Sequence, residues 1–400
     1  MKFMDDVAKH FNEIDREKTI VVICSLAPES VVAGILLFKA FIRDQRKVVL
    51  SFQGKVYTQE IVNSHYDAYF FLGFNDIDKD ILLDREIFLF SEDICLRVYK
   101  FIVELKKKNE DMISYACLFS RELLDEAITS GAVVKYNSIK IFTSCFTPLL
   151  QAVTSSINPY LPGISGNEKG ALQFFHEFNL NSMVSKNLLE LKEKEFKSFL
   201  TAVSLRRFGS EDFPSLDFYF LQKGFLKDSN ELLETIVFLC KLKKYSLVAG
   251  VCLDNELCKK ETLAIVKKYR SDLIYVLDWF YNHKTTFLDI PKFIFINLEN
   301  MFHESLLEDF TKVILDSYFY PKGKVVVTAL YTLDNRISFC IGISKVADVS
   351  LLESLKGLFD ESFIENGLFF GTLNTDTTDA FIEKLKNSLG NLVIEIEKEQ

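Results

Sequence analysis

The sequence predicts an α/β protein that begins with a doubly wound parallel sheet, and two observations support this fold class. First, runs of apolar, β-branched and aromatic residues, typical of buried strands, recur in the N-terminal quarter. They lie at 19–24, 47–52, 68–74 and 86–90. Second, helical patterns at 29–43 and 93–108 separate or follow these runs. Strands that alternate with helices indicate βαβ units, whose strands lie parallel in one sheet.

Helical patterns then dominate the sequence. One at 113–127 is followed by a short strand-like segment at 140–142 and by a turn-rich stretch at 158–170. Prolines and glycines crowd that stretch, so we expect a loop that leads into a helix at 171–178.

Two further helices are expected in the middle of the chain. Leu189, Phe196 and Val203 recur at heptad spacing and predict one apolar helix face. The pattern at 257–281 predicts a long linker helix. Its apolar stripe is expected to contain Leu263, Val266, Leu273, Leu277 and Phe280.

Strand patterns return in the last part of the chain. The expected elements are strands at 293–297, 324–331, 336–343 and near 368–370, a hairpin turn at 333–335, and helices at 351–358 and 378–389. We therefore predict three domains. They are an α/β domain at 1–180, a helical middle region with the linker helix at 181–285, and a smaller C-terminal α/β domain at 286–400.

Composition and charge make several classes of protein poor candidates. The chain is 48% hydrophobic and carries a net charge of -9, so it is a poor candidate for strong autonomous nucleic-acid binding, which needs a basic face. The eight cysteines have no C-x-x-C spacing, which favours reduced, buried thiols over a zinc site. We find neither a signal-peptide pattern nor a bilayer-length apolar stretch, and so expect a soluble, cytoplasmic protein with no membrane partner.

The turn between the first strand and the first helix holds little chemistry. In an open α/β sheet, ligands bind beyond the carboxyl ends of the strands. Metal or phosphate chemistry at that place is expected to use Asp, His, Gly or Lys. The turn Ser25–Ser30 offers one carboxylate, that of Glu29. An active-site position with inert residues is the main functional clue in the sequence.

Three segments and the order of elements resemble a known family. They are the loop at 158–171, the segment at 238–251 and the strand-like Arg336–Cys340. Together they resemble archaeal RecJ-type proteins of the DHH phosphoesterase superfamily, over nearly the whole chain. The resemblance implies that the N-terminal α/β domain is of the DHH type, with a C-terminal domain of the kind that accompanies it.

The resemblance also implies where the family's catalytic residues fall. The H-x-D-x-D motif falls on Ser25, Ala27 and Glu29, the next Asp on Gly73, and the Asp-His-His triplet on Ser91, Glu92 and Asp93. In the family these side chains hold two manganese-type ions. The Gly-Gly-His substrate loop is reduced to a segment that keeps Asn366, Gly367 and Gly371. We therefore expect vestigial positions, with no catalytic residue, metal or cofactor.

By this resemblance the expected function is non-catalytic. The inactive RecJ relative is the cell-division-control protein of the CMG replicative helicase. Its likeness implies an archaeal, nucleoid-associated replisome scaffold that binds the GINS complex and the MCM helicase and supports DNA unwinding.

Other interpretations stay open at the level of sequence. Glu29, Glu92 and Asp93 are the residues on which a weak manganese-dependent single-strand exonuclease or phosphodiesterase of the RecJ type would depend. Carboxylates at a helix start are more commonly caps or dipole partners. A third alternative is a sensor that binds a nucleotide in the vacant cleft.

Basic clusters offer a further alternative. They lie at 106–108, 206–207, 241–244, 259–260 and 267–268. We interpret them as solvated helix faces, and we expect any contact with single-stranded DNA to be weak and sensitive to salt.

Overall fold

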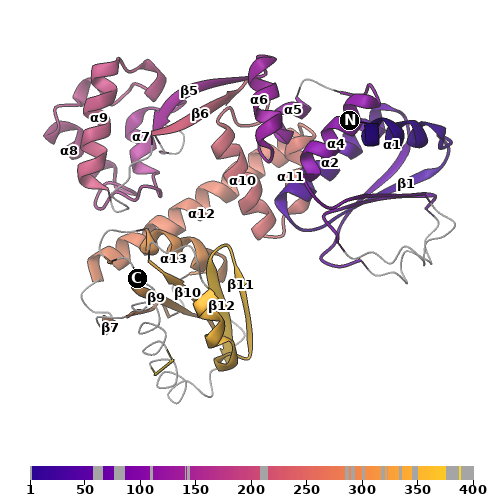
Figure 1. Ribbon diagram of the computed structural model, residues 1–400. Coiled ribbons are helices and arrows are strands. Elements are labelled where there is room, and N and C mark those ends of the chain that lie inside the picture. Colours follow the sequence, from indigo (N-terminus) through magenta and orange to yellow (C-terminus); the bar gives the residue numbers. More distant parts are fainter. Residues whose placement is uncertain are drawn as a thin grey trace. The chain divides into compact units, whose positions relative to one another are not determined.

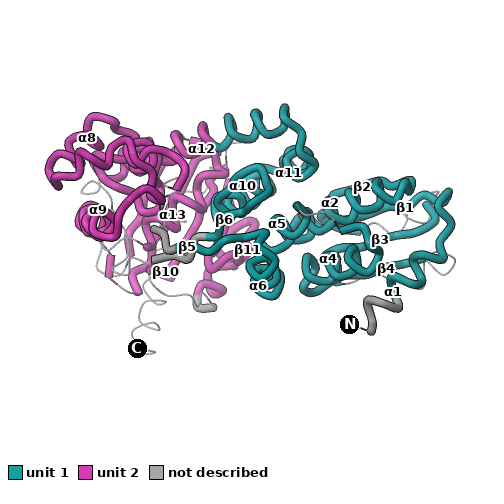
Figure 2. Tube along the Cα trace, turned by 90° about the horizontal axis from the view of Figure 1, so that it is seen from above, with its two compact units in different colours: residues 1–137, 217–266 teal, residues 138–216, 267–400 magenta. Residues whose placement is uncertain are grey.

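The structure is a computed structural model (Figure 1). It describes residues 2–56, 66–75, 86–108, 111–139, 141, 145–207, 215–283, 288–289, 293–299, 302–316, 320–321, 323–332, 336–344, 350–374 and 387–388. The chain divides into two compact units, each made of two segments (Figure 2). Unit 1 contains 1–137 and 217–266, and unit 2 contains 138–216 and 267–400. The three domain ranges expected from the sequence stay a prediction.

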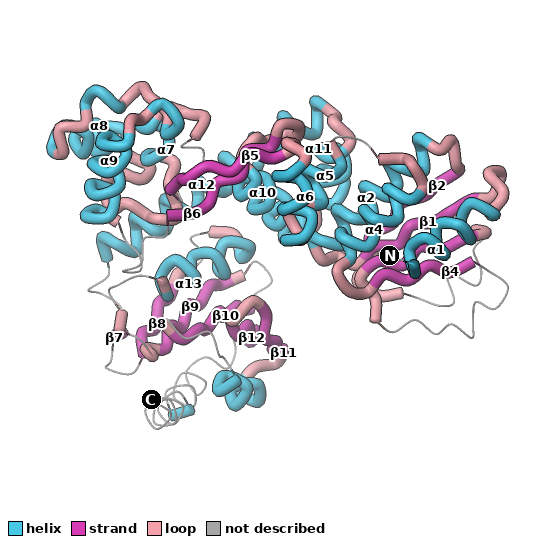
Figure 3. Tube along the Cα trace, turned by 45° about the horizontal axis from the view of Figure 1, so that its top comes forward, coloured by secondary structure: helices cyan, strands magenta, loops and turns pink. Residues whose placement is uncertain are grey.

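Unit 1 contains the parallel sheet that the sequence predicts (Figure 3). Its strands are β1 (Thr19–Cys24), β2 (Lys47–Phe52), β3 (Ala68–Leu72) and β4 (Glu86–Phe90). They pair in the order β2-β1-β3-β4, and every pair is parallel. The chain leaves β1 to one side for β2 and returns to its other side for β3, so the strand order reverses at β1.

Phenylalanine fills the core between this sheet and its helices. The helices are α1 (Lys2–Glu13), α2 (Pro28–Arg43) and α4 (Ile94–Glu104). Phe70 and Phe88 stack with ring centroids 4.4 Å apart, and Phe11, Phe41 and Phe101 close the cluster from the three helices. Offset and edge-on ring contacts add to the burial of apolar area. Some of the 38 phenylalanines of the chain therefore serve to fill the core of unit 1.

The rest of unit 1 departs from the sequence prediction. The expected helix at 113–127 is wrong as one element, because it is divided into α5 (Met112–Ala116) and α6 (Arg121–Thr129). Ser120 Oγ accepts a hydrogen bond from Leu123 N and starts the second helix. A two-stranded sheet of β5 (Val133–Ile139) and β6 (Ser215–Leu221) was not expected. Most of the strand expected at 140–142 lies outside the described residues.

Three helices complete the second segment of unit 1 and lead out of it. They are α10 (Ser229–Lys241), α11 (Tyr245–Cys252) and α12 (Glu256–His283). The predicted long helix is confirmed as α12, and Leu273, Leu277 and Phe280 are buried as expected. Leu263 was expected on the buried stripe, but 49% of it is exposed. That expectation was wrong.

The first segment of unit 2 is helical. It contains α7 (Leu149–Thr154), α8 (Glu168–Glu177) and α9 (Glu193–Arg206), with 3₁₀ turns η2 (Asn181–Met183) and η3 (Leu188–Glu190). The predicted loop before α8 is confirmed: Asn167 caps that helix by accepting from Gly170 N.

The heptad face expected around Val203 is wrong. The α9 helix begins only at Glu193, so Leu189 lies outside it and is 43% exposed. Phe199, Ala202 and Val203 form the buried face instead. Leu191 and Lys192 have extended backbone, so Leu189 is not part of the helix that contains Phe196 and Val203, and the three residues do not share one helix face.

The second segment of unit 2 forms a six-stranded mixed sheet. Its strands are β7 (Leu288–Asp289), β8 (Phe293–Asn297), β9 (Val325–Tyr331), β10 (Arg336–Ile343), β11 (Glu361–Glu365) and β12 (Leu368–Asn374), in the order β11-β12-β10-β9-β8-β7. The β8–β9 pair is parallel and the others are antiparallel. After the short η4 (Glu304–Leu306), α13 (Leu307–Leu315) packs on β9 and β10.

Most of the C-terminal expectations are confirmed. The segment expected as a helix at 351–358 is helical but of the 3₁₀ type, η5 (Ser350–Leu358). The hairpin turn expected at 333–335 and the helix expected at 378–389 lie outside the described residues, apart from 387–388. In the ranges given above, no helix combines the length and apolarity needed to cross a membrane.

Candidate functional site

The carboxyl ends of three neighbouring strands meet at one edge of the parallel sheet. Ser25, directly after β1, donates its backbone N–H to the carbonyl of Leu72 at the end of β3, at 2.8 Å. Gly73, directly after β3, donates to the carbonyl of Phe90 at the end of β4, also at 2.8 Å. The expected vestigial positions on β1 and β3 therefore lie together, at the reversal of strand order where α/β proteins bind ligands.

The carboxyl ends of β1 and β3 are closely packed around Ser25, Ser30 and Gly73. Ser25 Oγ donates to Ser30 Oγ at 2.8 Å, and Ser30 is fully buried. Gly73 has φ +77, and a Cβ on it would lie 2.2 Å from Ser30 Oγ and 2.4 Å from Ser25 Oγ. No side chain fits there unless the serine pair moves. A position at which the resemblance implies an aspartate is thus closed to one.

Glu29 is engaged in a structural contact. It lies in the first turn of α2, and its Oε1 accepts a hydrogen bond from the backbone N–H of Cys95 at 3.0 Å. Because α4 begins at Ile94, the Cys95 N–H has no acceptor within its own helix. A carboxylate there also faces the positive end of the α4 dipole. Glu29 therefore caps a neighbouring helix.

A second contact binds the same two helices. Cys95 Sγ donates to the carbonyl of Glu29 at 3.4 Å. Burial raises the pKa of the Cys95 thiol well above its ordinary value, and the Glu29 carboxylate raises it further. The thiol therefore stays protonated and serves as a donor.

Ala27 begins α2 without a capping side chain. It occupies the N-cap position with extended backbone, at φ -65 and ψ 136, and Pro28 follows as the first helical residue. Its carbonyl accepts from Val31 N at 3.0 Å. A proline at this position starts a helix well because the first N–H groups have no helical partner. Ala27 therefore contributes backbone geometry only.

The carboxylates after β4 are turned to solvent. Glu92 and Asp93 are exposed, and Ser91 is half-buried. Asp93 occupies the N-cap position of α4 in a left-handed conformation, at φ 43, and its side chain accepts no capping hydrogen bond. Of the two roles expected for carboxylates at a helix start, Asp93 does not fill that of a cap, and Glu29 from α2 supplies an acceptor there. Glu92 makes one surface ion pair, with Arg97 at 3.4 Å.

These residues do not form a metal site. Within the described ranges, no group of three His, Cys, Asp or Glu side chains is placed to hold an ion. Two manganese-type ions need several converging oxygen or nitrogen ligands. Here one carboxylate is committed to a helix terminus and two face solvent, so the residues do not fit such a centre.

The expected remnant of the C-terminal substrate loop is a tight hairpin. Asn366 and Gly367 connect β11 to β12 with φ values of 51 and 75, as a two-residue type I′ turn requires. Gly371 lies within β12, where a Cβ would be 2.3 Å from Phe359 Cδ1. These residues shape a strand pair.

The cysteines and basic clusters add no reactive group. All eight cysteines are free thiols, and burial raises the pKa of Cys117, Cys240 and Cys252 to about 12. Several clustered cations are in ion pairs, which favours the interpretation of solvated helix faces. These pairs are Lys107–Asp44, Lys108–Glu126, Arg206–Glu177 and Lys259–Asp254.

Sequence reasoning missed the two partners that explain the site. Ser30 and Cys95 carried no recognisable signal, because the first is a common helix residue and the second lies 66 residues from Glu29.

Comparison with known proteins identifies the fold through structure alone. No protein-family model matches the sequence, and no curated protein matches it. The crystal structure of CDC45 from Entamoeba histolytica is similar with a TM-score of 0.60 and 10% identity, covering 98% of this chain and 97% of that one. The crystal structure of RecJ in complex with Mn2+ from Thermus thermophilus has a TM-score of 0.53 and 9% identity.

The extent of the match differs between these structures. The Thermus comparison covers 99% of this chain but 55% of that RecJ, so this chain spans about half of it. A structure of the exonuclease RecJ bound to manganese, with a TM-score of 0.53 and 9% identity, is covered to 94%. Likeness at such identities concerns the fold. The chain has the RecJ-like DHH fold and is related in structure to CDC45.

Proposed function

We propose that this chain is a non-catalytic, CDC45-like scaffold of the replisome that binds GINS and MCM and supports the replicative helicase. The observation that carries the proposal is the contact between Glu29 Oε1 and Cys95 N, at 3.0 Å. It turns the one carboxylate left in the first motif into a helix cap. The close approach of Ser25 and Ser30 to Gly73, which leaves no room for a side chain there, supports the same conclusion.

The extent of structural likeness also supports this role. CDC45 from Entamoeba histolytica matches with a TM-score of 0.60, whereas the two manganese-bound RecJ structures match with 0.53. In this chain the family's ligand positions serve in packing and helix capping. We therefore attribute the retention of the fold to its surfaces.

A manganese-dependent exonuclease is the competing function, and the RecJ structures with bound manganese are its support. It would depend on Glu29, Glu92 and Asp93. The first accepts from a helix N–H and the other two are exposed, so the geometry favours the scaffold.

Co-elution tests the proposed function directly. The full chain is mixed with the GINS complex and the MCM helicase of its own source at about 10 μM, where a micromolar complex is mostly formed. Size exclusion is expected to show a shared peak. The double variant Glu92→Gln/Asp93→Asn is expected to co-elute equally well, because the scaffold needs neither carboxylate. Separate elution of the wild-type chain would overturn the proposal.

A nuclease assay distinguishes the competing function. Labelled single-stranded DNA with manganese is expected to remain intact with both the wild type and the double variant. Cleavage by the wild type that disappears in the double variant would establish the enzyme instead.

A further inference from the structure

The strand β11 lies at one end of the mixed sheet of unit 2, and its outer side pairs with no strand of the described chain. The sheet order is β11-β12-β10-β9-β8-β7, so β11 pairs with β12 alone (Figure 1). Such a strand presents backbone N–H and C=O groups that can pair with another extended chain. We name the open side of Glu361–Glu365 the β11 edge.

The hairpin turn determines which backbone groups the β11 edge offers. Glu365 and Leu368 close the two-residue turn, so they form a hydrogen-bonded pair of the antiparallel ladder. Hydrogen-bonded and non-hydrogen-bonded pairs alternate from there. The N–H and C=O groups of Ser362 and Ile364 therefore point away from β12, toward the open side.

An exposed phenylalanine lies at the centre of the β11 edge. Phe363 is 54% exposed, although its ring stacks on Phe370 of β12 with the centroids 5.0 Å apart. A residue opposite Phe363 on an added strand would belong to a non-hydrogen-bonded pair, in which side chains are closest. An aromatic residue at that position would cover the exposed ring.

Two glutamates flank this phenylalanine on the same face of the strand. Glu361 and Glu365 are each two residues from Phe363, and both are exposed. Exposed Asp360 adds a third acid directly before the strand. In the described parts of β10, η5 and α13, each cation already contacts an acid. The pairs are Arg336–Glu361 at 3.8 Å, Lys356–Glu353 at 3.2 Å and Lys312–Glu308 at 2.6 Å. The β11 edge is therefore an acidic surface around an aromatic centre.

We propose that the β11 edge binds an extended basic segment of another protein, which adds a strand antiparallel to β11. The segment has the pattern Lys/Arg-x-aromatic-x-Lys/Arg, because its alternate residues lie opposite Glu365, Phe363 and Glu361. Opposite charges across a strand pair are stabilising. Backbone hydrogen bonds supply affinity in this mode of recognition, and side chains supply specificity. The inference goes beyond the proposed function and does not depend on it.

Two other occupants fit the β11 edge less well. A second copy of β11, paired antiparallel about Phe363, would place Glu361 opposite Glu365, and like charges across a strand pair are destabilising. Among the last residues of this chain, Glu395 and Glu397 have the same spacing as the two edge glutamates. That segment would also bring like charges to the edge. The glutamates thus oppose self-pairing and favour a basic partner.

Peptide binding to the full-length chain tests the inference. The probe is the fluorescent peptide Gly-Lys-Thr-Phe-Thr-Lys-Gly, in which two basic residues flank the phenylalanine at the proposed spacing. A charge control replaces both lysines of the peptide by glutamate. Fluorescence anisotropy gives the affinities.

Two N-methylated peptides test the strand pairing itself. In the proposed complex, the N–H groups of both peptide threonines donate to the carbonyls of Ser362 and Ile364, whereas the N–H of the peptide phenylalanine points away from β11. Methylation of both threonine nitrogens removes these donors. Methylation of the phenylalanine nitrogen is the control, because it affects no hydrogen bond to β11.

Variants of the chain test the same contacts from the other side. Glu361→Lys/Glu365→Lys reverses the acidic pair. Its control, Glu104→Lys/Glu261→Lys, makes the same charge change at exposed glutamates of unit 1. Ser362→Pro removes an open-side donor without removing a hydrogen bond to β12, which proline on an edge strand allows. Ser362→Ala is its control, and circular dichroism checks that all variants keep the secondary structure of the wild type.

The basic peptide is expected to bind the wild type with a dissociation constant of about 100 μM. We expect at least about tenfold weaker binding for the threonine-methylated peptide, for Ser362→Pro and for the charge-reversed edge. The controls should change the affinity of the basic peptide by less than about twofold.

Several results would overturn the proposal. They are equal binding of the acidic or the threonine-methylated peptide, equal affinities of Ser362→Pro and Ser362→Ala, equal affinities of the two charge variants, and no binding of the basic peptide up to about 1 mM. A wild-type dimer in size exclusion that Ser362→Pro dissociates would also overturn it, since the edge would then bind a second copy.

Discussion

At the scale of single residues, the vestigial site is defined by what its residues do instead of catalysis. Glu29 caps α4, Ser25 pairs with Ser30, and Gly73 leaves room for that pair. Each role is satisfied within unit 1. Restoring a ligand at one of these positions would break a contact that now stabilises the fold.

Removal of the Glu29 carboxylate is expected to destabilise α4 locally. Glu29→Ala should lower the free energy of unfolding by about 1–2 kcal/mol, the usual cost of losing a helix cap. Urea titration measures the loss, and hydrogen exchange at the Cys95 amide should accelerate. Glu92→Ala is the matched control and should cost no more than about 0.5 kcal/mol, since its ion pair is on the surface. Equal costs would contradict the capping role.

Gly73 provides a second test, with Gly131 as its control. Both have positive φ, +77 and +73, but a Cβ at Gly131 meets nothing within 4 Å. Gly131→Ala should cost about 1 kcal/mol from backbone strain alone. Gly73→Ala should cost about 3 kcal/mol or more, because it also displaces the serine pair. Similar melting temperatures of the two variants would show that the serine pair does not exclude a side chain at Gly73.

The residue scale also shows where sequence reasoning ends. The absence of ligands at Ser25, Ala27 and Gly73 could be predicted, since it needs only residue identities. The capping role of Glu29 could not, because its acceptor geometry depends on how α2 lies against α4. The same limit applies to Asp93, which occupies the N-cap position of α4 with left-handed backbone and accepts no capping hydrogen bond with its side chain.

At the scale of elements, strands and helices that depend on neighbouring residues in the sequence could be predicted. The ends of strands β1 to β4 were predicted to within two residues, because polar segments bound their apolar runs. β5 and β6 were missed, since two strands far apart in sequence pair only with each other and leave a weak local signal. The division between α5 and α6 was missed because Ser120 acts as a cap within an otherwise helical pattern.

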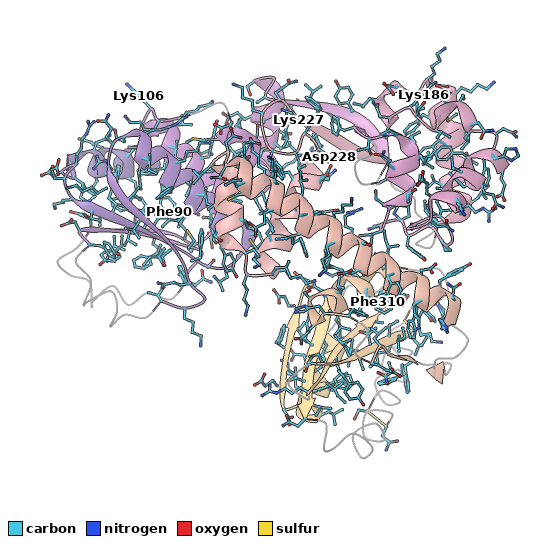
Figure 4. All side chains as sticks on the ribbon, turned by 180° about the vertical axis from the view of Figure 1, so that it is seen from behind. Phe90, Lys106, Lys186, Lys227, Asp228 and Phe310 are labelled. Carbon is cyan, nitrogen blue, oxygen red and sulfur yellow. The ribbon has the colours of Figure 1, made fainter. Side chains whose placement is uncertain are left out.

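The start of α10 gives a pH-dependent prediction. Asp228, next to Lys227 where β6 leads into α10 (Figure 4), accepts from Asn230 N and Glu231 N. Burial raises the pKa of this carboxyl to about 6, and the two backbone hydrogen bonds oppose the rise. In the unfolded chain the pKa is about 4. The folded state therefore binds more protons between these values, and its stability falls as pH rises from about 4 to about 6.

The variant Asp228→Asn isolates this effect because it keeps an oxygen acceptor and removes the titration. Relative to the variant, the wild type should lose about 2 kcal/mol of unfolding free energy between pH 4 and pH 7. Urea titrations at pH 4, 5, 6 and 7 measure the difference. Parallel curves for the two proteins would refute the raised pKa of the carboxyl.

At the scale of the whole molecule, the sequence was sufficient to predict the fold but not its division into units. The RecJ-like DHH fold was predicted from the resemblance of three segments and of the order of elements to that family, and the structural comparison supports it. The two discontinuous units could not be predicted from local patterns. The chain leaves unit 1 after Asn137, passes through a helical segment of unit 2, and re-enters unit 1 at Asp217. Such long-range returns have no signature in a window of neighbouring residues.

The central claim is that the strand ends of unit 1 are packed and capped and do not hold manganese. Calorimetric titration of manganese into the full chain at pH 7 tests it most directly. The account predicts no saturable binding up to about 1 mM, with identical traces for the wild type and Glu29→Gln. Stoichiometric micromolar binding that Glu29→Gln abolishes would contradict it.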